Sequence, residues 1–169
     1  MSENLPEPWL RGPIPGVHQL IMPLFFTFAH VREELSKHTV GLTDAQLWAK
    51  PANTTASVGF HLKHIAGSLD RLMTYLAGRQ LSQAQLDTLR HESEAGGSLD
   101  SLLALVNDSL RAAEEQLRKI DPESLYAPRV VGRRGLPSTV LGLIVHIAEH
   151  TQRHLGQAVT TSKIVRLSG

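Results

Sequence analysis

The stretch that decides the fold is LGLIVHIAEHTQRHLGQ, residues 141–157. Each residue of an α-helix advances by about 100° around the helix axis. If the direction of Val140 is taken as zero, five further residues lie within about 60° of it: Ile144, Ile147, Thr151, Leu155 and Ala158. This spacing predicts an amphipathic helix from 140 to about 161, with Ser138 or Thr139 as its N-cap. The chain beyond residue 163 is expected to be a tail.

The histidines of this segment differ in direction. His154 falls inside the apolar stripe and His150 lies on its flank at about 280°, whereas His146 at about 240° and Glu149 at about 180° face away from the core. The i, i+4 pair His150 and His154 therefore places two imidazoles one turn apart, close enough to hold one ion.

Toward the N-terminus, three further segments have the same period. They predict helices over 17–38, 57–76 and 98–120, with Ser57 and Ser98 as N-caps of the last two. Shorter signals are a Thr43 cap before a turn at 44–48, a capping box at Ser82 and Gln85, and a small hairpin-like excursion around a Gly132–Gly135 turn. Four long helices without a convincing strand predict an all-α four-helix bundle, whose long loops permit crossover connections.

Length and composition limit what this bundle can contain. The 169 residues predict a single domain over 17–163, preceded by an arm at 1–16 and followed by a tail at 164–169. The absence of cysteine excludes disulfides, thiolate nucleophiles and Cys-ligated zinc. A net charge of +1 without a basic stripe argues against nucleic-acid binding. With no signal-like N-terminus and no apolar run of about 18 residues, we expect a cytoplasmic protein that does not enter a membrane.

A metal site would need a donor from a second helix, because catalytic zinc-like sites commonly use three protein ligands and keep a position open. The segment SVGFHLKHIAGSLDRLMTYLAG, residues 57–78, offers His64 beside its apolar stripe and His61 one turn earlier on the same side. A buried histidine is often only a satisfied core residue, so the spacing alone leaves metal binding open.

Other polar residues have weaker signals. His61 and His146 are interpreted as edge residues or as partners of a ligand. Gln157 is either such a partner, a substrate contact or a solvent-facing side chain. No chemistry is expected of four further histidines: His18, His30, His38 and His91.

The two quoted segments resemble the DinB-like superfamily, the DinB/YfiT-like metalloenzymes. The resemblance extends over residues 17–163 and includes GLTDAQLWAKP (41–51), YLAGRQLSQAQL (75–86) and VGRRGLPSTV (131–140). It implies a four-helix bundle with crossover connections, and a divalent ion, nickel or zinc, held by the residues that match its motif: His64, His150 and His154. Phe60 departs from the family, in which many members have Trp at this place.

From these patterns we expect a metal-dependent enzyme of the thiol transferase or hydrolase type, with a small-molecule substrate such as a low-molecular-weight thiol. The alternative is a non-catalytic, metal-stabilised stress-response or binding module. The resemblance also implies a homodimer. Wide apolar faces on 17–38 and 98–120, with Phe25, Phe26 and Phe28 around much of the first, agree with a partner that buries surplus apolar surface.

Overall fold

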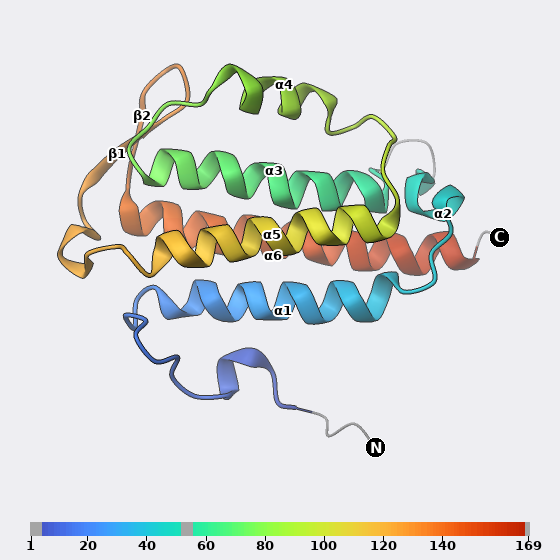
Figure 1. Ribbon diagram of the computed structural model, residues 1–169, viewed down its shortest axis with the longest axis horizontal. Helices are drawn as coiled ribbons and strands as arrows, with labels where there is room; N and C mark the ends of the chain where they lie inside the picture. The colour runs from blue at the N-terminus through green and yellow to red at the C-terminus, as the bar shows by residue number, and fades with distance from the viewer. Residues whose placement is uncertain (1–4, 52–55, 168–169) are drawn as a thin grey trace.

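The computed structural model describes residues 5–51 and 56–167. The four long helices that the periodicity predicts are α1 (Met22–Thr39), α3 (Val58–Leu76), α5 (Leu99–Leu117) and α6 (Val140–Leu167) (Figure 1). Shorter elements lie between and before them: η1 (Pro8–Leu10), α2 (Asp44–Trp48), α4 (Gln83–His91), η3 (Pro122–Ser124), β1 (Pro128–Val131) and β2 (Leu136–Thr139). The chain is a four-helix bundle with one small hairpin in the described residues.

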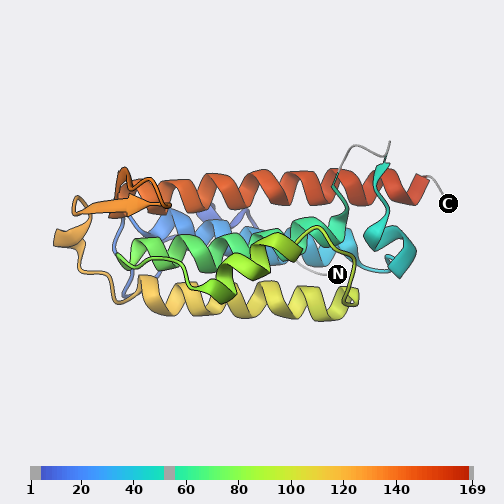
Figure 2. The same cartoon turned by 90° about the horizontal axis from the view of Figure 1, so that it is seen from above.

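The helices are joined by crossover connections, as expected. α6 packs against α1 and α3, while α5 packs against α3 and α1. Figure 1 shows that the neighbours α3 and α5 run in the same direction, opposite to α1 and α6. The connection over residues 77–98 must therefore return along the whole bundle, and it carries α4, which lies outside α3 in both views (Figure 2).

Polar caps fix where the helices begin. The predicted N-caps are confirmed: each of four side-chain oxygens accepts a backbone N–H in the first turn of its helix, namely Thr43, Ser57, Ser82 and Ser98. For α6 the cap is Thr139, whose Oγ1 accepts from the Gly142 N–H at 3.0 Å. The starts of α3 and α6, which hold the histidine clusters, are therefore fixed by local sequence.

The predicted hairpin is present just before α6. β1 and β2 pair antiparallel with Val131 opposite Leu136. Gly132 and Gly135 adopt φ of +71° and +60° in the turn, a conformation that disfavours residues with a Cβ. The Val140 N–H donates to the Ala127 carbonyl at 3.1 Å, so the hairpin is anchored to the first residue of α6.

Two helix boundaries differ from the prediction. α1 begins at Met22 instead of residue 17, and it tolerates Pro23 because a proline in the first turn costs no intrahelical hydrogen bond. α6 continues to Leu167, so the expected tail at 164–169 is wrong for 164–167. The reason is that its apolar face continues: Val165 is only 4% exposed, and Arg166 donates to the Val40 carbonyl at 2.6 Å. Residues 168–169 and 1–4 lie outside the described part of the chain.

The apolar face of α1 is covered within the chain, whereas the sequence predicts a surplus of apolar surface that a partner buries. Phe25 and Phe28 are buried in the core, and Phe26 is half-buried beside Pro8 of the N-terminal arm. Arg11 fastens the arm through two hydrogen bonds to the carboxylate of Glu33, at 2.5 and 2.8 Å. The homodimer stays a prediction, without support from this face of α1.

The long helices enclose one apolar core, to which each of them contributes fully buried side chains, among them Leu24, Phe28, Leu62, Ile65, Leu110 and Ile147. Within the described residues, no helix has the length and hydropathy of a bilayer-spanning segment.

The last turns of α6 should contribute measurably to stability. We expect Val165→Ala to lower the free energy of unfolding by about 2 kcal/mol, because it removes buried methyl groups and leaves a cavity. The matched control is Leu167→Ala, at a side chain that is 87% exposed, with an expected change within about 0.5 kcal/mol. Chemical denaturation measures both, and equal values would show that the end of α6 does not pack on the bundle.

Candidate metal centre

Three imidazoles meet where α3 packs against α6. His64 comes from α3, and His150 and His154 come from successive turns of α6. All three are half-buried, and each offers a ring nitrogen that lies within 4.8 Å of the others. His64 Nε2 and His150 Nε2 are 3.1 Å apart, and the ring centroids of His64 and His154 are 4.3 Å apart. The structure thus brings together the three residues predicted as ligands.

The geometry of this cluster suits a divalent ion. Nitrogens bound tetrahedrally at about 2.0–2.1 Å from zinc lie about 3.3 Å from one another. The 3.1 Å between the two Nε2 atoms is close to that value, and the wider spacing within the cluster needs only small side-chain rotations. Three imidazoles are a donor set that suits zinc, copper, iron or nickel.

Burial keeps these imidazoles in the form that can bind a metal. It lowers the pKa of His154 to about 3, with further contributions from the nearby rings of His64 and His150. Burial, followed by the neighbouring His64, also lowers the pKa of His150. At neutral pH both rings therefore carry a lone pair, which a metal requires.

A buried carboxylate holds His64 in position. Glu92 follows α4 directly, is 3% exposed, and its Oε2 lies 2.6 Å from His64 Nδ1. Its other oxygen accepts from Arg71 Nη1 at 2.5 Å. Burial raises the pKa of Glu92, but the hydrogen bonds from His64 and Arg71 outweigh it, and the net pKa is lowered. Because this carboxylate is ionised, His64 Nδ1 must donate, which leaves Nε2 free to face the cluster.

Glycine at position 67 makes room for this carboxylate. A Cβ at Gly67 would lie 2.3 Å from Glu92 Oε1 and 2.9 Å from Arg71 Nη1. His64, Gly67 and Arg71 are spaced i, i+3 and i+7, so they share one face of α3. That face therefore contains a ligand, a gap for the carboxylate and the cation that pairs with it.

His61 supports a second ligand. It lies one turn before His64 and is 4% exposed, with its Nδ1 3.1 Å from Nδ1 of His154. Burial, followed by the neighbouring His64, lowers the pKa of His61 to about 4, so the ring is neutral and can accept a hydrogen bond. When His154 Nδ1 donates to it, Nε2 of His154 carries the lone pair. This contact agrees with the interpretation of His61 as a partner of a ligand.

The structure places the other candidates outside the cluster. The side chain of His146 is 48% exposed, and its Nδ1 lies 2.7 Å from Glu149 on the outer surface of α6. Gln157 is exposed and lines the cavity described below. The four histidines without an expected role make contacts away from the three-histidine cluster: His18, His30, His38 and His91.

A cavity of about 730 Å³ opens beside His154. His61 and Phe60 form one wall, and the last turns of α6 form the other, with Arg153, Gln157 and Thr160 among its residues. Phe60 also stacks on His64, with the two rings 16° from parallel and their centroids 5.3 Å apart. The aromatic ring of Phe60 thus covers one face of the His64 ring.

Sequence reasoning missed Glu92 and Arg71. The polar stretch 79–97 has few apolar residues, and nothing in its pattern predicts that the end of α4 folds over α3. A signal was available in α3 itself, since Arg71 lies on the same face as His64 and a buried guanidinium requires an anion. The identity of that anion depends on the tertiary fold.

Comparisons with known proteins agree with this fold. The model of the DinB superfamily matches residues 27–158. YfiT from Bacillus subtilis, described as "a probable metal-dependent hydrolase with an unusual four-helix bundle topology", is 15% identical with a TM-score of 0.64, over 90% of this chain and 91% of that one. A DinB-like protein from Bacillus cereus ATCC 10987 is also 15% identical, with a TM-score of 0.61 over 83% of this chain and 89% of that one. No curated protein matches the sequence.

Removing the charge of Glu92 should weaken metal binding. We expect Glu92→Gln to raise the dissociation constant for zinc by about 10- to 100-fold, because an amide cannot replace the carboxylate that orients His64. Competition with a chromogenic chelator measures this constant. The matched control is Glu94→Gln, which changes an exposed side chain two residues away. If both variants bind zinc as the unmodified protein does, Glu92 has no influence on the centre.

Filling the gap at Gly67 should have the same effect without touching any ligand. We expect Gly67→Ala to push Glu92 away from His64 and Arg71, and so to weaken zinc binding at least about tenfold. Gly156→Ala serves as the control, since a Cβ there meets nothing within 4 Å. The control should keep its zinc affinity and gain up to about 1 kcal/mol of stability from its higher helix propensity. Unchanged zinc affinity in a folded Gly67→Ala protein would contradict the account.

Proposed function

The chain belongs to the DinB superfamily, and on that premise we propose that it is a metal-dependent hydrolase of a small molecule. The observation that carries the proposal is the convergence of His64, His150 and His154 beside an open cavity. The description of YfiT as a probable metal-dependent hydrolase supports the same chemistry. The ion is zinc or nickel, which neutral imidazoles bind well.

His64, His150 and His154 would hold a divalent ion through three ligands, and a bound ion would supply a water of near-neutral pKa or a deprotonated thiol. The chain's own residues prepare this site. Glu92 fixes the tautomer of His64, and His61 fixes that of His154. The lone pair of each ring is therefore on Nε2, the nitrogen that is available to the ion. The centre is then organised before a substrate arrives.

The cavity beside His154 is the proposed substrate site. Its volume of about 730 Å³ lies in the range of small-molecule sites. Phe60 and Ile164 offer apolar contacts, while Gln157 and Thr160 offer hydrogen bonds. Arg153 lines the same cavity and pairs with the exposed carboxylate of Glu149, a surface pair that an anionic group of the substrate can replace at low cost.

The same site also accommodates a low-molecular-weight thiol, in which case the chain transfers the thiol instead of hydrolysing a bond. The two reactions would differ in whether a water or the thiol occupies the coordination position that the three histidines leave free. A non-catalytic, metal-stabilised module would bind the ion equally well but turn over neither class of substrate. One set of assays distinguishes these outcomes.

The test is turnover by zinc- or nickel-loaded protein of a panel of small esters, amides and thiol conjugates. We expect hydrolysis that disappears on chelation and returns with the metal. His154→Ala should lose the bound metal and lower kcat/KM by at least about a hundredfold, because one of three ligands is removed. His146→Ala, at the exposed histidine of the same helix, should keep one metal ion per chain and its activity.

Two results would contradict the proposal. Full metal content in His154→Ala, measured by elemental mass spectrometry, would show that the ion is bound elsewhere. Stoichiometric metal in the unmodified protein without turnover of any panel member would favour the binding module.

A further inference from the structure

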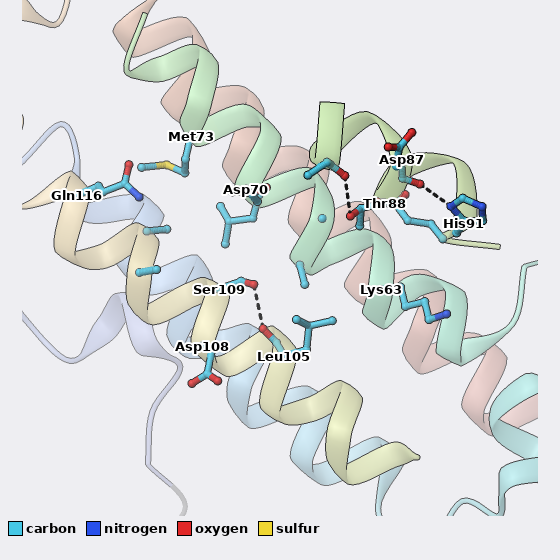
Figure 3. Close-up of a pocket in the computed structure, with 17 residues that line it drawn as sticks. Lys63, Asp70, Met73, Asp87, Thr88, His91, Leu105, Asp108, Ser109 and Gln116 are labelled. Atoms are coloured by element: carbon cyan, nitrogen blue, oxygen red, sulfur yellow. Dashed lines mark hydrogen bonds between the residues drawn. The ribbon is translucent and has the colours of Figure 1, made fainter. Parts of the chain in front are cut away.

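A second and larger cavity lies on the opposite side of α3 from the cavity beside His154. It is a groove of about 910 Å³ between α4 and α5, with α3 as its floor (Figure 3). None of the three clustered histidines lines it. We call it the α4–α5 groove. Gly67 and Glu92, whose carboxylate holds His64, also line it, but the inference does not depend on the proposed function, because neither the ion nor the substrate of that function enters the groove.

The floor of the groove is apolar and made partly of small side chains. Leu69 and Met73 of α3 and Ala113 of α5 are at most 3% exposed, and they form the bottom. Ala112 and Leu105 of α5 continue the apolar surface to the edge, where Leu105 is 46% exposed. Small residues at the bottom and on the α5 side leave a volume that side chains do not fill.

The wall of the groove opposite α5 is formed by α4, which has no buried residue. The side chain of Gln85 connects α4 to α3 by donating to Asp70 Oδ2 at 2.8 Å and to Thr74 Oγ1 at 2.7 Å. This contact between α4 and α3 is polar. The size of the groove is in the range of small-molecule pockets.

Most of the charged residues along the groove are acidic. Asp70, Asp87, Asp108 and Glu92 line it, against a single ammonium, that of Lys63, and Glu92 already has two ion-pair partners. The Lys63 ammonium donates to the Glu94 carbonyl at 2.7 Å and lies 5.1 Å above the Trp48 ring, so it already has partners. The whole chain, by contrast, has a net charge of +1. The groove is therefore locally acidic on a chain that is not.

Asp70 has the least compensated of these charges. Asp87 and Asp108 pair with arginines on their own helices, at 2.7 and 2.8 Å. The partner of Asp70 is the neutral amide of Gln85, and no cation among the described residues forms an ion pair with it. A carboxylate next to an apolar floor attracts a ligand that combines both properties, a positive charge and an apolar body.

We propose that the α4–α5 groove binds an apolar small molecule that carries one positive charge, with its apolar part on Leu69, Met73 and Ala113 and its cationic group at Asp70. An anionic amphiphile of the same length is repelled by the carboxylate of Asp70, which has no cationic partner among the described residues. A neutral one gains only the apolar contacts.

The test uses n-decylammonium as the probe, below its critical micelle concentration, with the full chain in its metal-loaded form. Isothermal titration calorimetry should give saturable binding of one molecule per chain. n-Decanoate should bind at least about fivefold more weakly, since one unit charge at about 4 Å in water contributes about 1 kcal/mol. Equal binding of the two amphiphiles, or no saturable binding of the cation, overturns the proposal.

Variants then locate the probe. Ala112→Trp fills the groove from an exposed position and should abolish binding, while Ala104→Trp, also exposed on α5 but outside the groove, should not change it. Asp70→Asn keeps an acceptor for Gln85 and should weaken decylammonium about fivefold without affecting decanol. Asp100→Asn removes the same charge from α5 outside the groove and should change neither. Binding that survives Ala112→Trp in a folded protein overturns the placement.

Discussion

The contact between α3 and α6 determines what this bundle can do. The two helices run antiparallel, and each carries histidines on the flank of its apolar stripe, so packing the stripes together also brings the imidazoles together. The hydrophobic contacts of Leu62 and Ile65 with the core, and of Ile147 and Leu155 from the other helix, supply the free energy that holds the rings at this distance. The site is thus a consequence of core packing, and no loop has to close to assemble it.

A second layer of interactions gives this cluster its chemical character. Glu92 and Arg71 form a buried ion pair whose carboxylate also accepts from His64. Such a pair contributes little net stability, because desolvation offsets much of the attraction. Its consequence is orientation: His64 Nδ1 is committed to the carboxylate, and Nε2 is committed to the cluster. Gly67 leaves room for this arrangement, because a Cβ there would lie in the space of the carboxylate.

Much of this could be predicted from the sequence, because the deciding signals are local. Periodicity located the four helices, side-chain caps fixed the starts of α3, α5 and α6, and the i, i+4 spacing of His150 and His154 indicated their common direction. What failed depended on tertiary contacts. The predicted end of α6 was too early because only the packing of Val165 on the bundle shows that the helix continues. Glu92 was missed because it reaches His64 only after α4 folds over α3. The contact of the arm with α1 is also tertiary, since Arg11 reaches Glu33 only in the folded chain.

The central claim is that three histidines bind one divalent ion. X-ray absorption at the metal edge of the loaded protein tests it most directly, because imidazole rings produce a characteristic multiple-scattering pattern. The account predicts about three imidazole nitrogens at about 2.0–2.1 Å, with the remaining coordination supplied by an exchangeable oxygen donor. A shell of oxygens alone, or a spectrum with one imidazole or none, would contradict it.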